Sequence, residues 1–214
     1  MFRDRAEAGE KLADRLGQYK GQETIVLAIP RGGLLVAVPI IKQIHCHWDL
    51  IIPRKLGAPH NPEFAIGAVS VDGTYYLQED YVKMLGVPQA YIDQEVKEQT
   101  REIKRRMEKY RGKSEPPEVK NRRVIIVDDG IATGLTVLAA IKSIQNQNAA
   151  KTVIAVPVGP PDSIEKLRTF ADEVVCLATP EPFYAVSEHY ENFQQVEDDE
   201  VFALLTELKG IGRV

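Results

Sequence analysis

The stretch that decides the fold is Val124-Ile125-Ile126-Val127-Asp128-Asp129-Gly130-Ile131-Ala132-Thr133-Gly134-Leu135-Thr136. Its apolar start predicts a buried strand, and the apolar-periodic segment 135–144 predicts a helix. A loop that opens a helix presents free N–H groups at the positive end of the helix dipole, so it favours a phosphate. Ionised Asp128 and Asp129 only accept hydrogen bonds, which suits sugar hydroxyls. The two features together indicate a site for a ribose 5-phosphate; the alternative is a turn capped by Thr133 with solvated carboxylates.

Strands and helices alternate along the rest of the chain, and Asp72-Gly73 predicts a hairpin turn between two of the strands. This alternation predicts an α/β fold with a mostly parallel central sheet flanked by helices, in which ligands bind beyond the carboxyl ends of the strands. We expect strands at 24–29, 48–52, 65–71, 74–77, 123–127, 152–158 and 174–177, and helices at 3–19, 33–44 (kinked at Pro39), 88–110, 135–147, 163–170 and 201–209.

The composition is that of an ordinary globular domain. The chain has 214 residues, of which 44% are hydrophobic and 27% charged. A net charge of −4 indicates no broad surface for nucleic acid. Two distant cysteines, a charged N-terminus without a following apolar run, and no apolar stretch of membrane-spanning length predict a cytoplasmic protein with free thiols. His45-Cys46-His47 is not expected to bind metal, since neighbouring side chains point apart.

Three further segments carry groups suited to ligands. Ala28-Ile29-Pro30-Arg31-Gly32-Gly33-Leu34 combines glycines, which permit close backbone approach, with an arginine that can bind an oxyanion. In the segment 53–63, Arg54 and Lys55 are expected to end a strand before a Gly/Pro-rich loop. The segment 179–193 contains the aromatic residues Phe183 and Tyr184. The alternatives are a tight turn, a solvated strand end and a hydrophobic packing corner, respectively.

The stretch 124–136 resembles the thirteen-residue phosphoribosyl diphosphate (PRPP) motif of type I phosphoribosyltransferases, and the resemblance extends from Arg3 to about Phe193. It implies that Asp128 and Asp129 bind the ribose hydroxyls and offset the charge of an oxocarbenium-like transition state. It further implies a cis peptide bond in the Arg31 loop and a Mg²⁺ ion held mainly by PRPP. The residues implied for the 5-phosphate are Ala132, Thr133, Gly134, Leu135 and Thr136, and those implied for pyrophosphate are Arg31, Gly32, Gly33, Arg54 and Lys55; Lys55 is also counted as catalytic.

The other segments resemble parts of the same family less closely. Residues 53–63 are similar to its mobile catalytic loop, with His60 and Glu63 as acid–base candidates. Residues 179–193 are similar to the late segment of the 6-oxopurine enzymes, where Phe183 or Tyr184 would stack on the base. Two departures from those enzymes are Ala132, where they have an acidic residue, and Val156-Pro157-Val158-Gly159-Pro160, which lacks their lysine. Hypoxanthine and guanine are therefore expected to be poor substrates.

We interpret the chain as one phosphoribosyltransferase-like domain, 1–214, with a mobile loop, hairpin and long-helix insertion at 56–117 and a hood with a C-terminal helix at 178–214. The expected reaction moves ribose 5-phosphate from PRPP to a nitrogen nucleophile, a nucleobase in nucleotide salvage, in a homodimer that binds neither membrane nor nucleic acid. One alternative is a PRPP-sensing regulator, favoured by the segment 97–113 with eight basic and three acidic residues. Another is a catalytically dead interaction module.

Overall fold

A parallel sheet carries the predicted motif at its centre. In the computed structural model, which describes residues 1–211, this sheet has five strands in the order β2-β1-β6-β7-β8. Every pairing in it is parallel, and Ala28 at the end of β1 lies opposite Val127 at the end of β6. The loops that follow these two strands therefore leave the same edge of the sheet. The strands are β1 (Thr24–Ala28), β2 (His47–Leu50), β6 (Arg123–Val127), β7 (Lys151–Val158) and β8 (Glu173–Ala178).

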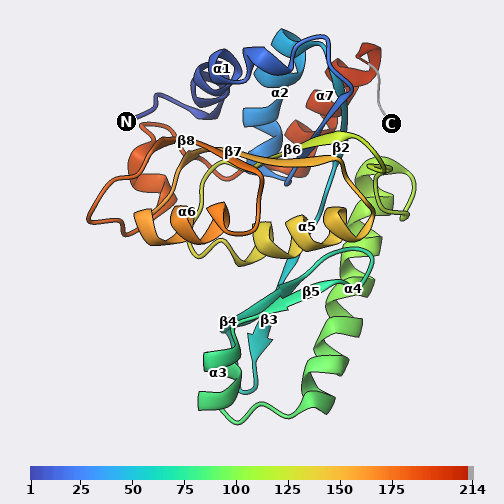
Figure 1. Ribbon diagram of the computed structural model, residues 1–214, viewed down its shortest axis with the longest axis vertical. Helices are drawn as coiled ribbons and strands as arrows, with labels where there is room; N and C mark the ends of the chain where they lie inside the picture. The colour runs from blue at the N-terminus through green and yellow to red at the C-terminus, as the bar shows by residue number, and fades with distance from the viewer. Residues whose placement is uncertain (212–214) are drawn as a thin grey trace.

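Helices cover both faces of this sheet, which confirms the predicted fold class (Figure 1). One face packs against α1 (Arg5–Arg15), α2 (Gly32–Ile44) and α7 (Asp198–Glu207), and the other against α5 (Leu135–Asn146) and α6 (Pro161–Arg168). Successive residues of β6 enter different cores, Ile125 the first and Ile126 the second. A strand buried on both faces reads as a continuous apolar run, which is why the pattern of the motif strand is so clear. Short 3₁₀ turns complete this part at Gly17–Tyr19, Val186–His189 and Leu208–Gly210.

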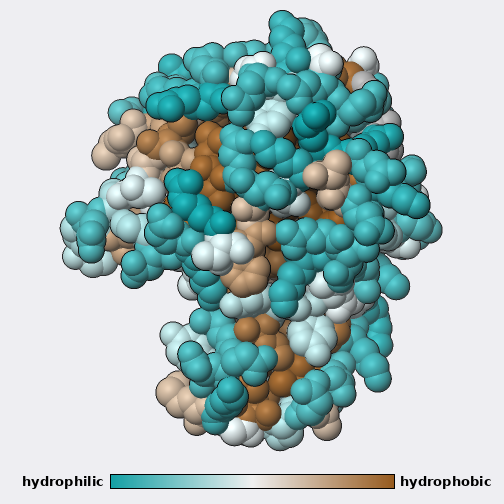
Figure 2. Space-filling model, viewed as in Figure 1, coloured by the Kyte–Doolittle hydropathy of each residue, from teal (hydrophilic) through white to brown (hydrophobic). Residues whose placement is uncertain are grey.

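A second, antiparallel sheet forms a lobe beside the first (Figure 1). The predicted hairpin turn is confirmed, with Gly73 at a φ of 82°. The apolar side of the long helix finds its partner within the chain, since Ile103 and Met107 pack against Leu56 and Ile66. Apolar residues also reach the surface of this lobe (Figure 2). The lobe consists of β3 (Arg54–Ala58), β4 (Asn61–Val69), β5 (Tyr75–Leu77), α3 (Glu79–Met84) and α4 (Gln89–Arg111).

The expectation of a loop at 53–63 is wrong. Arg54 and Lys55 begin strand β3 instead of ending a strand, and only Pro59 and His60 form the turn to β4. The glycine that suggested a loop lies at a register shift in the β3–β4 pairing, where a β carbon on Gly57 would be 2.7 Å from the Pro62 carbonyl oxygen. Glycine in a strand often marks such a bulge or a close backbone approach.

A buried ion pair joins the lobe to the parallel sheet. Arg111, at the end of α4, donates from Nε to Asp49 Oδ1 at 2.7 Å, and its Nη2 donates to the other carboxylate oxygen. Both side chains are fully buried.

The C-terminal part lies close to strand β2, because Trp48 Nε1 of that strand donates to the carbonyl oxygen of Ile211. Across residues 1–211, none of the helices has the length and apolar character that crossing a membrane requires.

Candidate functional site

The two glycine-bearing loops meet at the carboxyl edge of the parallel sheet. A β carbon on Gly33 would lie 2.7 Å from the Val127 carbonyl oxygen and 2.9 Å from the Asp128 Cα. A β carbon on Gly32 would lie 1.8 Å from Asp129 Oδ2. Only glycine permits this approach without displacement. The structure therefore places Gly32 and Gly33, two of the residues predicted for pyrophosphate, against Asp128 and Asp129, the residues predicted for ribose.

The Arg31 loop has the features implied by the resemblance. The Pro30–Arg31 peptide bond is cis, and α2 begins at Gly32, directly after it. The first N–H groups of a helix have no partner within the helix. Arg31 Nη1 lies 3.7 Å from Glu197 Oε2 and 3.8 Å from Asp198 Oδ1, and all three side chains are more than a third exposed. Such exposed, long ion pairs are weak, so the Arg31 guanidinium can turn to an incoming anion at little cost.

The motif loop presents an uncapped helix start. Gly134 stands at the N-cap of α5 with a φ of 71°, and no side chain caps that helix. The alternative of a Thr133 cap is therefore not seen; Thr133 and Ala132 are both exposed. Ser163 of α6 steadies the loop, because its Oγ donates to the Ala132 carbonyl oxygen at 2.9 Å. The loop thus offers the backbone N–H groups of the first turn of α5 to a phosphate.

The acidic pair is largely withdrawn from solvent. Asp128 Oδ1 accepts a hydrogen bond from the Asp129 backbone N–H at 2.9 Å. Burial raises the pKa of Asp128 well above its ordinary value, and the neighbouring Asp129 carboxylate raises it further. Two carboxylates so close together favour a positively charged ligand, or a ligand that donates hydrogen bonds to them.

Two residues of this site were not found from the sequence. Arg5 Nε donates to Asp129 Oδ2 at 2.7 Å, although 124 residues separate them. Tyr190 donates its hydroxyl to the Asp129 carbonyl oxygen at 2.6 Å, and burial raises the pKa of Tyr190. Neither residue stands in a motif, so no local pattern could have indicated it.

The two cations of β3 take different directions. Arg54 donates from Nε to Gln99 Oε1 of α4 at 2.5 Å, and burial lowers the pKa of Arg54. Lys55 is exposed and lies opposite Ala68 in the β3–β4 pairing. Ala68 packs against Leu135 in the first turn of α5. Lys55 therefore shares the sheet face that packs on the motif helix, whereas Arg54 faces the long helix.

The candidate base-binding residues lie in the hood. Phe183 stacks on His189, with ring centres 5.0 Å apart and planes at 23°, so one face of Phe183 is already covered. Phe183 also packs against a small hydrophobic cluster, as the packing-corner alternative required. Tyr184 is 77% exposed and remains accessible. The acid–base candidates His60 and Glu63 are both exposed, in the β3–β4 hairpin.

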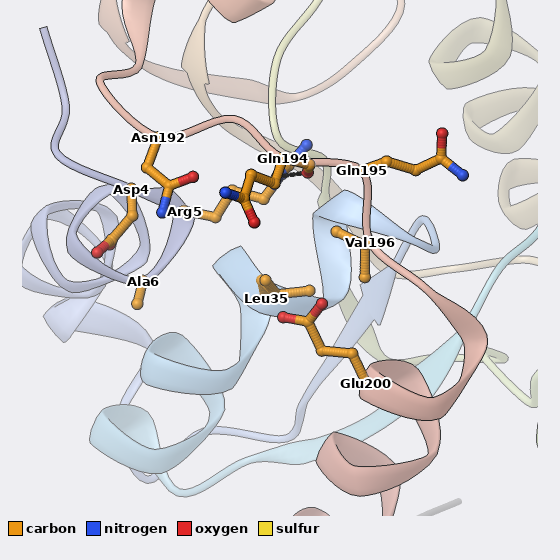
Figure 3. A pocket seen from close by; sticks show the side chains of 9 residues that line it. All are labelled: Asp4, Arg5, Ala6, Leu35, Asn192, Gln194, Gln195, Val196 and Glu200. Atoms are coloured by element: carbon orange, nitrogen blue, oxygen red, sulfur yellow. Dashed lines mark hydrogen bonds between the residues drawn. The ribbon is translucent and has the colours of Figure 1, made fainter.

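A cavity of about 280 Å³ opens between the starts of α1, α2 and α7 and the hood segment 192–196 (Figure 3). Its wall includes Arg5, but none of the residues predicted to bind PRPP lines it.

The residues described contain no cluster of three or more His, Cys, Asp or Glu side chains that could hold a metal ion. Asp128 and Asp129 supply hard oxygen donors that suit Mg²⁺ but are too few to hold it alone, so they fit a metal held mainly by its phosphate ligand. Cys46 is buried between the exposed His45 and His47, and both cysteines are free thiols.

Comparisons with known proteins show which proteins this chain is similar to. Two proteins of Mycobacterium tuberculosis, from strains CDC 1551 / Oshkosh and H37Rv, each named "Putative phosphoribosyl transferase", are 43% identical to this chain over 205 residues. These matches cover 96% of the chain but 46% of each relative, so the chain spans about half the length of the curated relatives it matches. A protein from Thermus thermophilus with a known crystal structure is 38% identical to this chain in sequence. Its structure matches this one with a TM-score of 0.81, over 97% of this chain and 98% of that one.

A family model described as the phosphoribosyl transferase domain matches residues 4–192. This range includes the motif stretch, the Arg31 loop and the hairpin lobe. The chain therefore belongs to the phosphoribosyl transferase domain family, a family of transferases.

Proposed function

We propose that the protein transfers ribose 5-phosphate from PRPP to a nitrogen nucleophile, a nucleobase, and releases pyrophosphate. The observation that carries this proposal is the packing of Gly32 and Gly33 against Asp129 and Asp128. It supports a single site in which one loop receives the pyrophosphate while the other receives the ribose and its 5-phosphate. We extend the proposal to a cytoplasmic homodimer that acts in nucleotide salvage.

Each group has a distinct role in the proposed reaction. The backbone of 132–136 binds the 5-phosphate and fixes the ribose. Arg31, with the N–H groups at the start of α2, draws the departing pyrophosphate away from the sugar. Asp128 and Asp129 accept the ribose hydroxyls and stabilise the positive charge that develops on the ring, so catalysis consists of positioning and charge stabilisation. Mg²⁺, when bound, would neutralise charge on the pyrophosphate, and the carboxylates of Asp128 and Asp129 are the residues that fit it.

The acceptor is proposed to bind beneath the hood, near the exposed Tyr184. Ala132 offers no acid or base to the nucleophile, and the segment 156–160 offers no lysine to a base oxygen. A buried carbonyl oxygen left without a donor costs about 1–3 kcal/mol. A base without a 6-oxo group is therefore the better candidate than hypoxanthine or guanine.

The PRPP-sensing alternative depended on the basic segment 97–113. Arg105 and Arg106 of this segment pair with Glu102 on the same helix, and these hydrogen bonds lower the pKa of Glu102 to about 2. Lys109 pairs with Asp198, and Arg111 is buried. These four cations have protein partners, so we favour the transferase over a regulator that binds nucleic acid.

A pyrophosphate-release assay tests the proposed function. The wild-type protein is incubated with PRPP, Mg²⁺ and each member of a panel of nucleobases, with Asp128→Asn plus Asp129→Asn as the inactive control. We expect release with at least one base, slower release with hypoxanthine and guanine, and none with the control. Wild-type protein that binds PRPP but releases no pyrophosphate with any base would contradict the transferase and favour the sensor.

A further inference from the structure

We propose that Arg5 is a positioning residue that holds the Asp129 carboxylate against Gly32 and so prepares the acidic pair for the ribose hydroxyls. This inference rests on the proposed function, because it concerns the same site. Arg5 lies at the first position of α1, far from the motif in sequence, and the family motif does not include it.

The Arg5 guanidinium is fixed by three contacts that use different parts of the group. Nε donates to Asp129 Oδ2 at 2.7 Å, and Nη1 donates to the Gln194 carbonyl oxygen at 2.9 Å. The guanidinium carbon lies 3.7 Å from the centre of the Phe193 ring. The side chain is only 9% exposed. A planar guanidinium can satisfy all three contacts at once, whereas the point charge of a lysine cannot.

The start of the chain is itself anchored to the hood, which places Arg5 beside the motif. Phe2 donates its backbone N–H to the His189 carbonyl oxygen at 2.8 Å, and Asn192 donates its N–H to the Arg3 carbonyl oxygen at 2.9 Å. Asp4 then caps α1 by accepting from the Glu7 N–H at 2.8 Å. Figure 3 shows Arg5 between α1 and the hood segment that carries Gln194. The hood, the N-terminal helix and the motif thus converge on one guanidinium.

The contact has an electrostatic consequence for the pair. Two adjacent carboxylates that are partly withdrawn from water repel each other, so a cation beside them stabilises the arrangement in which both face a ligand. Arg5 is placed to do this, because its Nε lies 2.7 Å from Asp129 Oδ2. On other sides of the pair, the Tyr190 hydroxyl of the hood donates to the Asp129 carbonyl oxygen, and Gly32 and Gly33 of α2 lie against Asp129 and Asp128. Arg5 thus supplies the positive charge that forms a salt bridge with the pair.

The test compares calorimetric PRPP binding, with Mg²⁺ present, by the wild-type, Arg5→Gln, Arg5→Lys and Arg3→Gln proteins at neutral pH. Arg3 is the matched control, because it is a mostly exposed arginine two residues earlier that pairs with Asp4. We expect Arg5→Gln to weaken PRPP binding about tenfold or more at neutral pH, as loss of a charged hydrogen bond does. Arg5→Lys keeps the positive charge but cannot make all three contacts, so it should recover part of the lost affinity. Arg3→Gln should bind PRPP as the wild type does.

A double-mutant cycle with Asp129→Asn separates positioning from a purely structural role. In the Asp129→Asn background, Arg5→Gln should reduce PRPP affinity no further, because it has no carboxylate to hold. Equal reductions in both backgrounds, or no recovery of affinity in Arg5→Lys, would overturn the inference. If Arg5→Gln does not fold, Arg5→Lys takes its place in the cycle, with a reduction expected in the wild-type background alone. Wild-type protein that fails to bind PRPP at all would instead refute the proposed function.

Discussion

The motif edge of the parallel sheet and the hairpin lobe differ in how they place their charged residues. At the motif edge, the loops at 28–34 and 124–136 are adjacent because β1 and β6 pair in parallel, with Ala28 opposite Val127. In the lobe, Arg54 and Lys55 are neighbours in sequence but point to opposite sides of β3. Parallel pairing therefore places the motif residues and the Arg31 loop side by side at one edge of the sheet. In the lobe, the strand pairing and the packing on α4 determine the direction of each side chain. We expect the motif edge to control ligand binding and the lobe contacts to control mainly stability.

The largest effect is expected where the lobe joins the sheet. Arg111→Ala removes the guanidinium that faces the buried Asp49 carboxylate. Breaking a buried ion pair in this way costs about 3–5 kcal/mol of unfolding free energy. Urea denaturation measures this loss, with the exposed Lys104→Ala on the same helix as the control. The folded fraction should bind PRPP as the wild type does; a loss of stability below about 1 kcal/mol would contradict the assigned role of the pair.

The acidic pair should show the opposite balance, with binding lost and stability largely kept. Asp128→Asn plus Asp129→Asn should weaken PRPP binding about a hundredfold or more, which corresponds to about 2.7 kcal/mol, because two charged hydrogen-bond acceptors are lost. The melting temperature should fall less than for Arg111→Ala, because removing the two carboxylates relieves their mutual repulsion while it also breaks the salt bridge between Asp129 and Arg5. The matched control in the lobe is Glu79→Gln plus Asp80→Asn, an exposed acidic pair on α3. Calorimetric PRPP affinity equal to that of the wild type would contradict the ribose assignment.

Gly134→Val tests the phosphate loop. Gly134 has a φ of 71°, which a β-branched residue resists, so the start of α5 should shift and weaken both PRPP and ribose 5-phosphate about tenfold. Free pyrophosphate should bind unchanged. Gly112→Val is the control, because Gly112 has a φ of 72° at the end of α4 and nothing within 4 Å of an added β carbon. Loss of pyrophosphate binding with ribose 5-phosphate retained would mean that the two phosphate loops are assigned in the wrong order.

The smallest expected effect separates the two cations of β3. Lys55→Ala should weaken pyrophosphate binding about threefold, the scale of an exposed charge contact, whereas Arg54→Ala should leave it nearly unchanged. The reason is that Arg54 is engaged by Gln99, while Lys55 lies on the face that packs on α5. Competition titrations with inorganic pyrophosphate measure both constants. A larger loss from Arg54→Ala would break the distinction between the two side chains.

The sequence predicted most of the fold, and it singled out the two loops that the structure brings together at the candidate site, for physical reasons that individual elements make clear. The motif strand is buried on both faces, so its apolar run was unmistakable. Asp72-Gly73 correctly marked the hairpin turn between β4 and β5. Gly57 and Pro62 suggested a loop because glycine and proline are loop signals, but the strand pairing of β3 and β4 overrode them. Arg5 could not be predicted, since a contact between residues 124 positions apart depends on how the hood and α1 pack.

The measurement that tests the central claim most directly is a calorimetric titration of PRPP with Mg²⁺ into the wild-type protein. It is repeated after saturation with ribose 5-phosphate and, separately, after saturation with pyrophosphate. The account predicts one PRPP site per chain, blocked by either ligand, because the motif loop and the Arg31 loop form two halves of one site. Two results would contradict it: no binding of PRPP, or PRPP binding that neither ribose 5-phosphate nor pyrophosphate weakens.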